Sequence, residues 1–147
     1  MKKPDLFVYK SGLLTALLLL GTPVAQADMV DAAMYVATEQ YDKAFAEYTR
    51  EATNGNSEAF YWLGMMYYNG TGTTQDYNKA IDWFLRAAAE HGENGDDKAM
   101  KMLGDMNLLG QGIDKNPESA LEYYKHASDL GNPDAGYITG NIYAQGI

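Results

Sequence analysis

Apolar residues recur at helical spacing in the middle of the chain. Ala59, Leu63 and Tyr67 follow one another at intervals of four residues, which places them on one face of a helix. A second helical pattern runs from about Tyr77 to His91. Its expected buried face combines small alanines, which let backbones approach, with large rings that fill the space between: Ala80, Trp83, Phe84, Ala87 and Ala88. The pattern therefore predicts a pair of packed helices.

Glycines separate the two predicted helices. Gly70 and Gly72 follow the first helix, and we expect them to end it because glycine enters the left-handed conformation at low cost. Gly64 lies inside that helix and removes a side chain where a neighbouring helix must come close. Pro117 stands near the start of a later helical pattern, where a first-turn position suits it.

The same pattern occurs twice and begins a third time. Residues 59–92 align with residues 99–131, and a third copy starts at Ala135. The shared positions are Ala59, Leu63, Gly64, Gly70, Gly72, Ala80, Ala87 and Gly92 in the first copy and Ala99, Leu103, Gly104, Gly110, Gly112, Ala120, Ala127 and Gly131 in the second. A spacing of 40 residues from Gly64 to Gly104, then 36 to Gly140, predicts a stacked array of helical units.

These residues resemble the Sel-one-like repeat (SLR) family, which is related to the tetratricopeptide repeats. The family pattern is roughly A-x-x-x-L-G-x-x-Y-x-x-G-x-G, a short loop with Asp, then K-A-x-x-W and A-A-x-x-G. The first copy carries it at Ala59, Leu63, Gly64, Tyr67, Gly70, Gly72, Asp76, Lys79, Ala80, Trp83, Ala87, Ala88 and Gly92. The second copy departs at Asn107, Ser119 and Ser128. The resemblance implies an all-α, α-α superhelix, or solenoid, over residues 28–147.

The resemblance also divides that solenoid. Residues 28–56 lack the Gly-x-Gly loop, but residues 41–45 look like a tetratricopeptide-like second helix, so we interpret them as a divergent first helix pair. Two repeats follow over residues 57–96 and 97–132, and residues 133–147 form an incomplete repeat.

The first 27 residues have the order of a secretory signal peptide. Three lysines within the first ten residues precede an apolar run over residues 13–20, a Gly–Pro breaker and the small-residue triplet 25–27. We therefore expect cleavage after Ala27 and a periplasmic or secreted protein. An uncleaved membrane anchor is the alternative, but the apolar run is shorter than the roughly 20 residues of a spanning helix.

Charge and composition limit the classes of partner and activity that we expect for this protein. The formal net charge of −9 disfavours nucleic acid and anionic lipid, and favours a basic partner. The chain has no cysteine for a disulfide, and its two histidines offer no metal-ligand spacing. We expect no enzyme, no cofactor and no metal. The alternative is an envelope-acting enzyme or enzyme subunit related to the cell wall or beta-lactams. Some cysteine-rich exported members of the family are linked to binding cell-wall components or beta-lactam compounds, but their disulfides are absent here, so no activity is carried over from them.

The first helix of each unit is expected to line a concave surface that binds a protein or peptide partner. Its candidate contacts in the first copy are Tyr61, Met65 and Tyr68. The equivalent candidates in the next two copies are Lys101, Asp105, Tyr137 and Asn141. Exposed aromatic side chains suit this role because such anchors carry much of the energy of binding. Ordinary contacts between repeats are the alternative interpretation.

The sequence ends at Ile147, inside the loop that would lead to a second helix. Ile138, Ile142 and Tyr143 would then lack the surface on which they pack. Three explanations stay open: the sequence is a fragment, two chains stack end to end, or another protein supplies the missing helix. We expect self-association through this open end.

Overall fold

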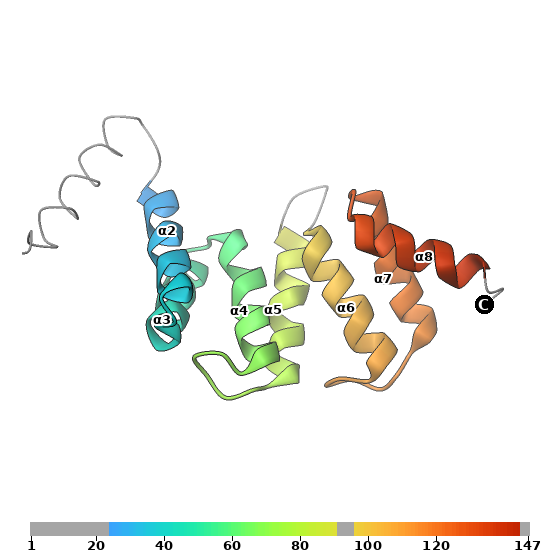
Figure 1. Cartoon of the computed structure of the whole chain (residues 1–147), viewed down its shortest axis with the longest axis horizontal. Coiled ribbons are helices and arrows are strands. Elements are labelled where there is room, and N and C mark those ends of the chain that lie inside the picture. Colours follow the sequence, from blue (N-terminus) through green and yellow to red (C-terminus); the bar gives the residue numbers. More distant parts are fainter. Residues whose placement is uncertain (1–23, 91–95, 145–147) are drawn as a thin grey trace, which may run out of the picture.

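The structure is a computed structural model that describes residues 24–90 and 96–144. These residues form seven helices and no strand, arranged in a row (Figure 1). The helices are α2 (Val24–Ala37), α3 (Tyr41–Thr53), α4 (Ser57–Asn69), α5 (Tyr77–Glu90), α6 (Asp97–Leu109), α7 (Pro117–Asp129) and α8 (Pro133–Ala144). The predicted all-α solenoid is confirmed. Residues 1–23 of the expected signal peptide lie outside the described residues, and the expected cleavage point after Ala27 falls in the first turn of α2.

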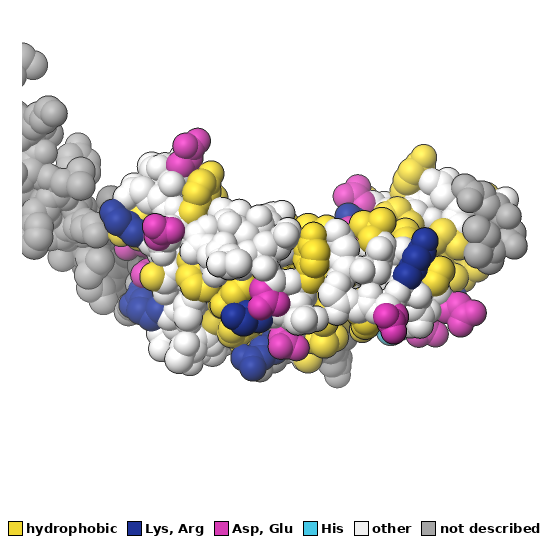
Figure 2. Space-filling model, turned by 90° about the horizontal axis from the view of Figure 1, so that it is seen from below, with side chains coloured by type: hydrophobic (Ala, Val, Ile, Leu, Met, Phe, Trp, Pro, Cys, Tyr) yellow, Lys and Arg dark blue, Asp and Glu magenta, His cyan; other side chains and the backbone are white. Residues whose placement is uncertain are grey.

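The helices pack in chain order. The extensive contacts all join consecutive helices, within the pairs α2–α3, α4–α5 and α6–α7 and across the junctions between them. This is the arrangement of a solenoid, in which each unit touches only its neighbours. Figure 2 shows the described surface as a shallow arch that is hollowed along its upper edge.

Polar caps and left-handed glycines set the ends of the helices. The side chain of Asn116 accepts a hydrogen bond from the Ser119 N–H at 3.0 Å and so caps α7, whose first residue is Pro117. Gly70, with φ of 70°, ends α4, and Gly110, with φ of 73°, ends α6. The predicted corner glycines and the first-turn proline are confirmed.

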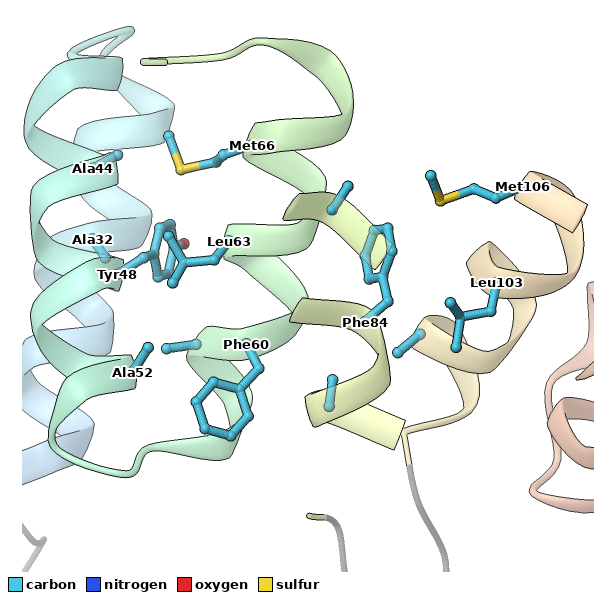
Figure 3. Packing of buried hydrophobic residues seen from close by; sticks show 14 residues of the cluster. Ala32, Ala44, Tyr48, Ala52, Phe60, Leu63, Met66, Phe84, Leu103 and Met106 are labelled. Atoms are coloured by element: carbon cyan, nitrogen blue, oxygen red, sulfur yellow. The ribbon is translucent and has the colours of Figure 1, made fainter. Parts of the chain in front are cut away.

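Small residues and rings alternate through the core. Tyr48 in α3, Phe84 in α5 and Tyr124 in α7 occupy equivalent positions and are all buried. Figure 3 shows Tyr48 and Leu63 facing each other between α3 and α4. Of the predicted buried face of α5, Ala80, Phe84 and Ala87 are buried, whereas Trp83 and Ala88 are only partly buried and pack against the core cluster.

Two of the helical glycines, Gly64 and Gly104, lie directly against an aromatic ring of the following helix. A Cβ on Gly64 would lie 2.5 Å from the ring of Phe84, and one on Gly104 would lie 2.7 Å from the ring of Tyr124. The expected close approach at Gly64 is therefore confirmed. Nothing lies within 4 Å of the same position on Gly140 of α8.

The second glycine of each loop joins neighbouring units. Gly72 has φ of 69°, and a Cβ there would overlap the backbone carbonyl of Tyr41 at the start of α3. Gly112 has φ of 71°, and its Cβ would lie 2.6 Å from the Cβ of Tyr77 at the start of α5. Each loop therefore rests on the first residue of the second helix of the preceding unit.

Candidate functional site

Two of the predicted contact residues on α4 connect that helix to later elements. Tyr61 and Tyr68 are both half-buried. The Tyr61 ring lies 6.0 Å from the ring of Phe84, and the Lys98 Nζ is 6.0 Å from its centroid. The Tyr68 hydroxyl donates a hydrogen bond to the Gln111 Oε1 at 2.9 Å. Both tyrosines therefore contribute to the packing between neighbouring repeats, in addition to any contact with a partner.

The predicted contact residues on α6 belong to a polar network. The Lys101 Nζ donates to one oxygen of Asp105 at 2.7 Å, and the Tyr124 hydroxyl donates to the other at 2.8 Å. Burial raises the pKa of Tyr124, and the hydrogen bond and charge of Asp105 raise it further. In the preceding repeat the equivalent positions hold the apolar residues Met65 and Phe84, so the polar pair is particular to the second repeat.

We expect Tyr124→Phe to lower the free energy of unfolding by about 1 kcal/mol, because Asp105 loses one donor but keeps Lys101. The folded state holds the Tyr124 proton above pH 10, where the unfolded state releases it, so wild-type stability falls as pH rises beyond that point. We measure the free energy of unfolding by urea denaturation at pH 8 and at pH 11. Raising the pH should lower this free energy less in Tyr124→Phe than in the wild type. The same loss in both proteins would contradict this network.

The predicted residues on α8 are more open. Tyr137 is 73% exposed and Tyr143 is 56% exposed. Asn141 is also exposed, whereas Ile138 and Ile142 are partly buried against the core cluster of α7. The two isoleucines therefore pack within the described array, and the tyrosines present rings to its surface.

A groove that the sequence analysis did not locate lies where α2 and α3 meet α4 and the loop that follows it. We call it the α3–α4 groove; its volume is about 510 Å³. Its main lining residues are Val36, Tyr41, Tyr48, Trp62, Met65 and Met66, with residues 69–72 at one end. Tyr41 is 37% exposed and Trp62 is 39% exposed, so the groove presents aromatic surface to an incoming ligand.

Only Met65 of the groove was a predicted contact. The groove forms at the junction between the divergent first helix pair and the first complete repeat, so aligning the repeats could not reveal it. One indication in the sequence is Trp62, which stands where the next two copies have Met102 and Ile138. A tryptophan at a position that the other units fill with smaller residues suggests a local role.

A metal site and a membrane-spanning helix were also sought among the described residues. No group of three or more histidine, cysteine, aspartate or glutamate residues there is arranged to hold a metal ion. Within residues 24–90 and 96–144, no helix has the length and apolar character needed to cross a membrane.

Comparison with known proteins identifies the repeat. The profile of the Sel1 repeat matches residues 57–91 and 97–132. A stretch of 75 residues is 36% identical to the HRD3A component of an ERAD-associated E3 ubiquitin-protein ligase of Arabidopsis thaliana, and covers 50% of this chain and 10% of that protein. A stretch of 112 residues is 38% identical to an uncharacterized protein of Neisseria meningitidis, covering 76% of this chain and 22% of that protein. The chain thus spans a tenth to about a fifth of these relatives.

Solved structures share the architecture. A protective antigen of uropathogenic Escherichia coli with an SLR fold superimposes with a TM-score of 0.74 at 28% identity, over 88% of this chain and 27% of that one. A Sel1 repeat protein from Oxalobacter formigenes gives 0.73 at 27% identity, over 95% and 57%. Proteins of this family are typically non-enzymatic scaffolds that mediate protein–protein interaction. With both the repeat profile and the solenoid in agreement, this chain belongs to the Sel1-repeat family.

Proposed function

We propose that this protein is an exported adaptor that binds an extended segment of a partner protein in the α3–α4 groove. The observation that carries the proposal is the groove itself, a depression of about 510 Å³ with predominantly apolar walls. Apolar concavities with a few aromatic residues are the usual form of binding sites in proteins. Tyr41 and Trp62 would act as anchors, since each has apolar surface left to bury.

The predicted contacts outside the groove extend this proposal. Tyr137 and Asn141 are exposed on α8 and are available to a partner that follows the array. Tyr61 and Tyr68 offer only part of their surface, because they also join helices of the array.

Export rests on the N-terminal sequence, with its basic start, apolar run and small-residue triplet before residue 28. The partner would then reside in the bacterial envelope or outside the cell. Mass spectrometry of the chain recovered from a periplasmic fraction tests this assignment: Asp28 is expected as the first residue, and an intact N-terminus in that fraction would contradict cleavage after Ala27.

Affinity capture from an envelope extract tests binding, using the wild-type chain, Trp62→Ala and the control Leu85→Ala. Leu85 is 42% exposed, close to the 39% of Trp62, but does not line the groove. A partner should be retained by the wild type and the control, and about tenfold less by Trp62→Ala, because truncating an aromatic anchor costs more than 1 kcal/mol.

Circular dichroism should show the same helix content in all three proteins, so that lost capture reports on the groove and not on folding. Equal retention of every captured protein by Trp62→Ala and by wild type would remove the basis for placing the site in the α3–α4 groove.

A further inference from the structure

Trp62 and Glu58 place an aromatic face next to a carboxylate at the α3–α4 groove. The Trp62 ring is stacked on Tyr48, with centroids 6.0 Å apart and planes 16° from parallel. Glu58 is exposed and lies one helical turn before Trp62 on α4, so the two side chains are neighbours. Burial raises the pKa of Tyr48, and the charge of Glu58 raises it further.

Several aromatic rings of the described residues have a cation of the same chain over them. Rings with a lysine or arginine over them belong to Tyr35, Tyr61, Tyr67, Trp83 and Tyr143. The closest example is Arg86, whose guanidinium carbon lies 4.6 Å from the centroid of Trp83.

Trp62 has no such cation among the described residues, a property that it shares with the exposed rings of Tyr41 and Tyr137. The Trp62 side chain is more than a third exposed. Glu58 likewise forms no ion pair with any described residue. No charged side chain lines the groove either. Trp62, whose ring also contacts that of Tyr61 edge-on, and Glu58, one helical turn before it, are therefore both exposed and have no cation of the described chain paired with them.

We propose that the α3–α4 groove selects an extended segment with an arginine and, two residues away, an apolar residue; this rests on the proposed function. The guanidinium stacks on Trp62 and pairs with Glu58, while the apolar side chain enters the groove beside Tyr41 and Met65. Residues two apart in an extended chain point to the same side, which lets both reach the groove. Arginine suits the position better than lysine because its planar group stacks on rings and pairs with carboxylates.

The charge of the whole protein acts in the same direction. A formal net charge of −9 attracts basic segments and accelerates their association at low ionic strength. Because Glu58 is exposed, its attraction for a bound arginine is screened by salt. The preference for arginine should therefore weaken between 0.1 M and 0.5 M sodium chloride.

The experiment uses the chain with Trp83→Phe, which leaves Trp62 as the sole tryptophan whose fluorescence reports binding. The probes are the peptide acetyl-Ala-Arg-Ala-Leu-Ala-amide and the same peptide with glutamine in place of arginine. We expect the arginine peptide to bind about tenfold more tightly than the glutamine peptide. Calorimetry on the chain with both tryptophans should give the same ratio, independent of the reporter.

The variant Glu58→Gln separates charge from shape. It should weaken the arginine peptide about fivefold and leave the glutamine peptide unchanged. The matched control Asp82→Asn removes an exposed carboxylate of α5, which does not line the groove, and should change neither affinity.

Equal affinity for the two peptides, binding of neither, or an undiminished arginine preference in Glu58→Gln would overturn this inference. If capture of a partner still depends on Trp62 in that case, the proposed adaptor function stands and only the arginine specificity fails. If capture is also independent of Trp62, the proposed binding site fails as well.

Discussion

Replacing Gly72 with alanine is expected to lower the free energy of unfolding by about 3 kcal/mol. Its φ of 69° is costly for any residue with a Cβ, and that Cβ would overlap the backbone carbonyl of Tyr41. A backbone atom at the start of α3 cannot move aside without displacing the helix, so the overlap adds the cost of overpacking. Gly112→Ala should behave alike, since its Cβ would lie 2.6 Å from the Tyr77 Cβ.

Two other glycines separate the backbone cost from the clash. Gly55 and Gly131 have φ of 85° and 94°, but nothing lies within 4 Å of a Cβ on either. Their alanine variants should lose only about 1 kcal/mol, the cost of left-handed backbone alone. Urea denaturation followed by circular dichroism measures all four. If Gly55→Ala and Gly72→Ala lowered the free energy of unfolding equally, the contact between the Gly72 loop and the start of α3 would make no contribution to the effect.

The variant Gly64→Ala is expected to lower the free energy of unfolding by about 2 kcal/mol. The new methyl group would lie 2.5 Å from the ring of Phe84, which is completely buried, so the methyl group overpacks the core. In contrast, Gly140→Ala should raise stability by up to about 1 kcal/mol. That position lies in the helix α8 with nothing within 4 Å, and alanine favours the helix over glycine.

A double-mutant cycle tests the cause of the Gly64 effect. Phe84→Leu alone should destabilise the protein, but it should also remove the atoms that the Gly64→Ala methyl group meets. The combined variant should therefore lose less than the sum of the two single losses. Strict additivity, or equal responses of Gly64 and Gly140 to alanine, would contradict the ring contact.

The helices and their pairing could be predicted because the pattern repeats. Ala59, Leu63, Gly64 and Gly70 have counterparts 40 residues later, so each copy supports the assignment of the other. Local chemistry fixes these positions: a left-handed glycine ends α4, and a helical glycine lies under a ring. Residue type and spacing are enough to recognise such positions, so the helices and their pairing could be predicted from the sequence alone.

The α3–α4 groove could not be predicted in this way. It depends on how Tyr41 and Val36 of the divergent first pair meet Trp62, and no repeat spacing encodes that junction. The network of Asp105 and Tyr124 was equally hidden, since their side chains are 19 residues apart and meet only after α6 packs on α7. Contacts between side chains on different helices cannot be predicted from repeat spacing and are identified only from the structure.

The chain-order packing of the helices has a consequence for how the protein opens. Because the extensive contacts in the described array join consecutive helices, no described helix beyond α4 makes extensive contacts with α2 and α3. Such a molecule can melt from an end, one unit at a time, and slow amide hydrogen exchange would concentrate in its middle. A ligand bound in the α3–α4 groove would contact both the first and the second helix pair and would oppose this fraying. Binding could then be measured as increased protection of the α3 amide hydrogens from exchange.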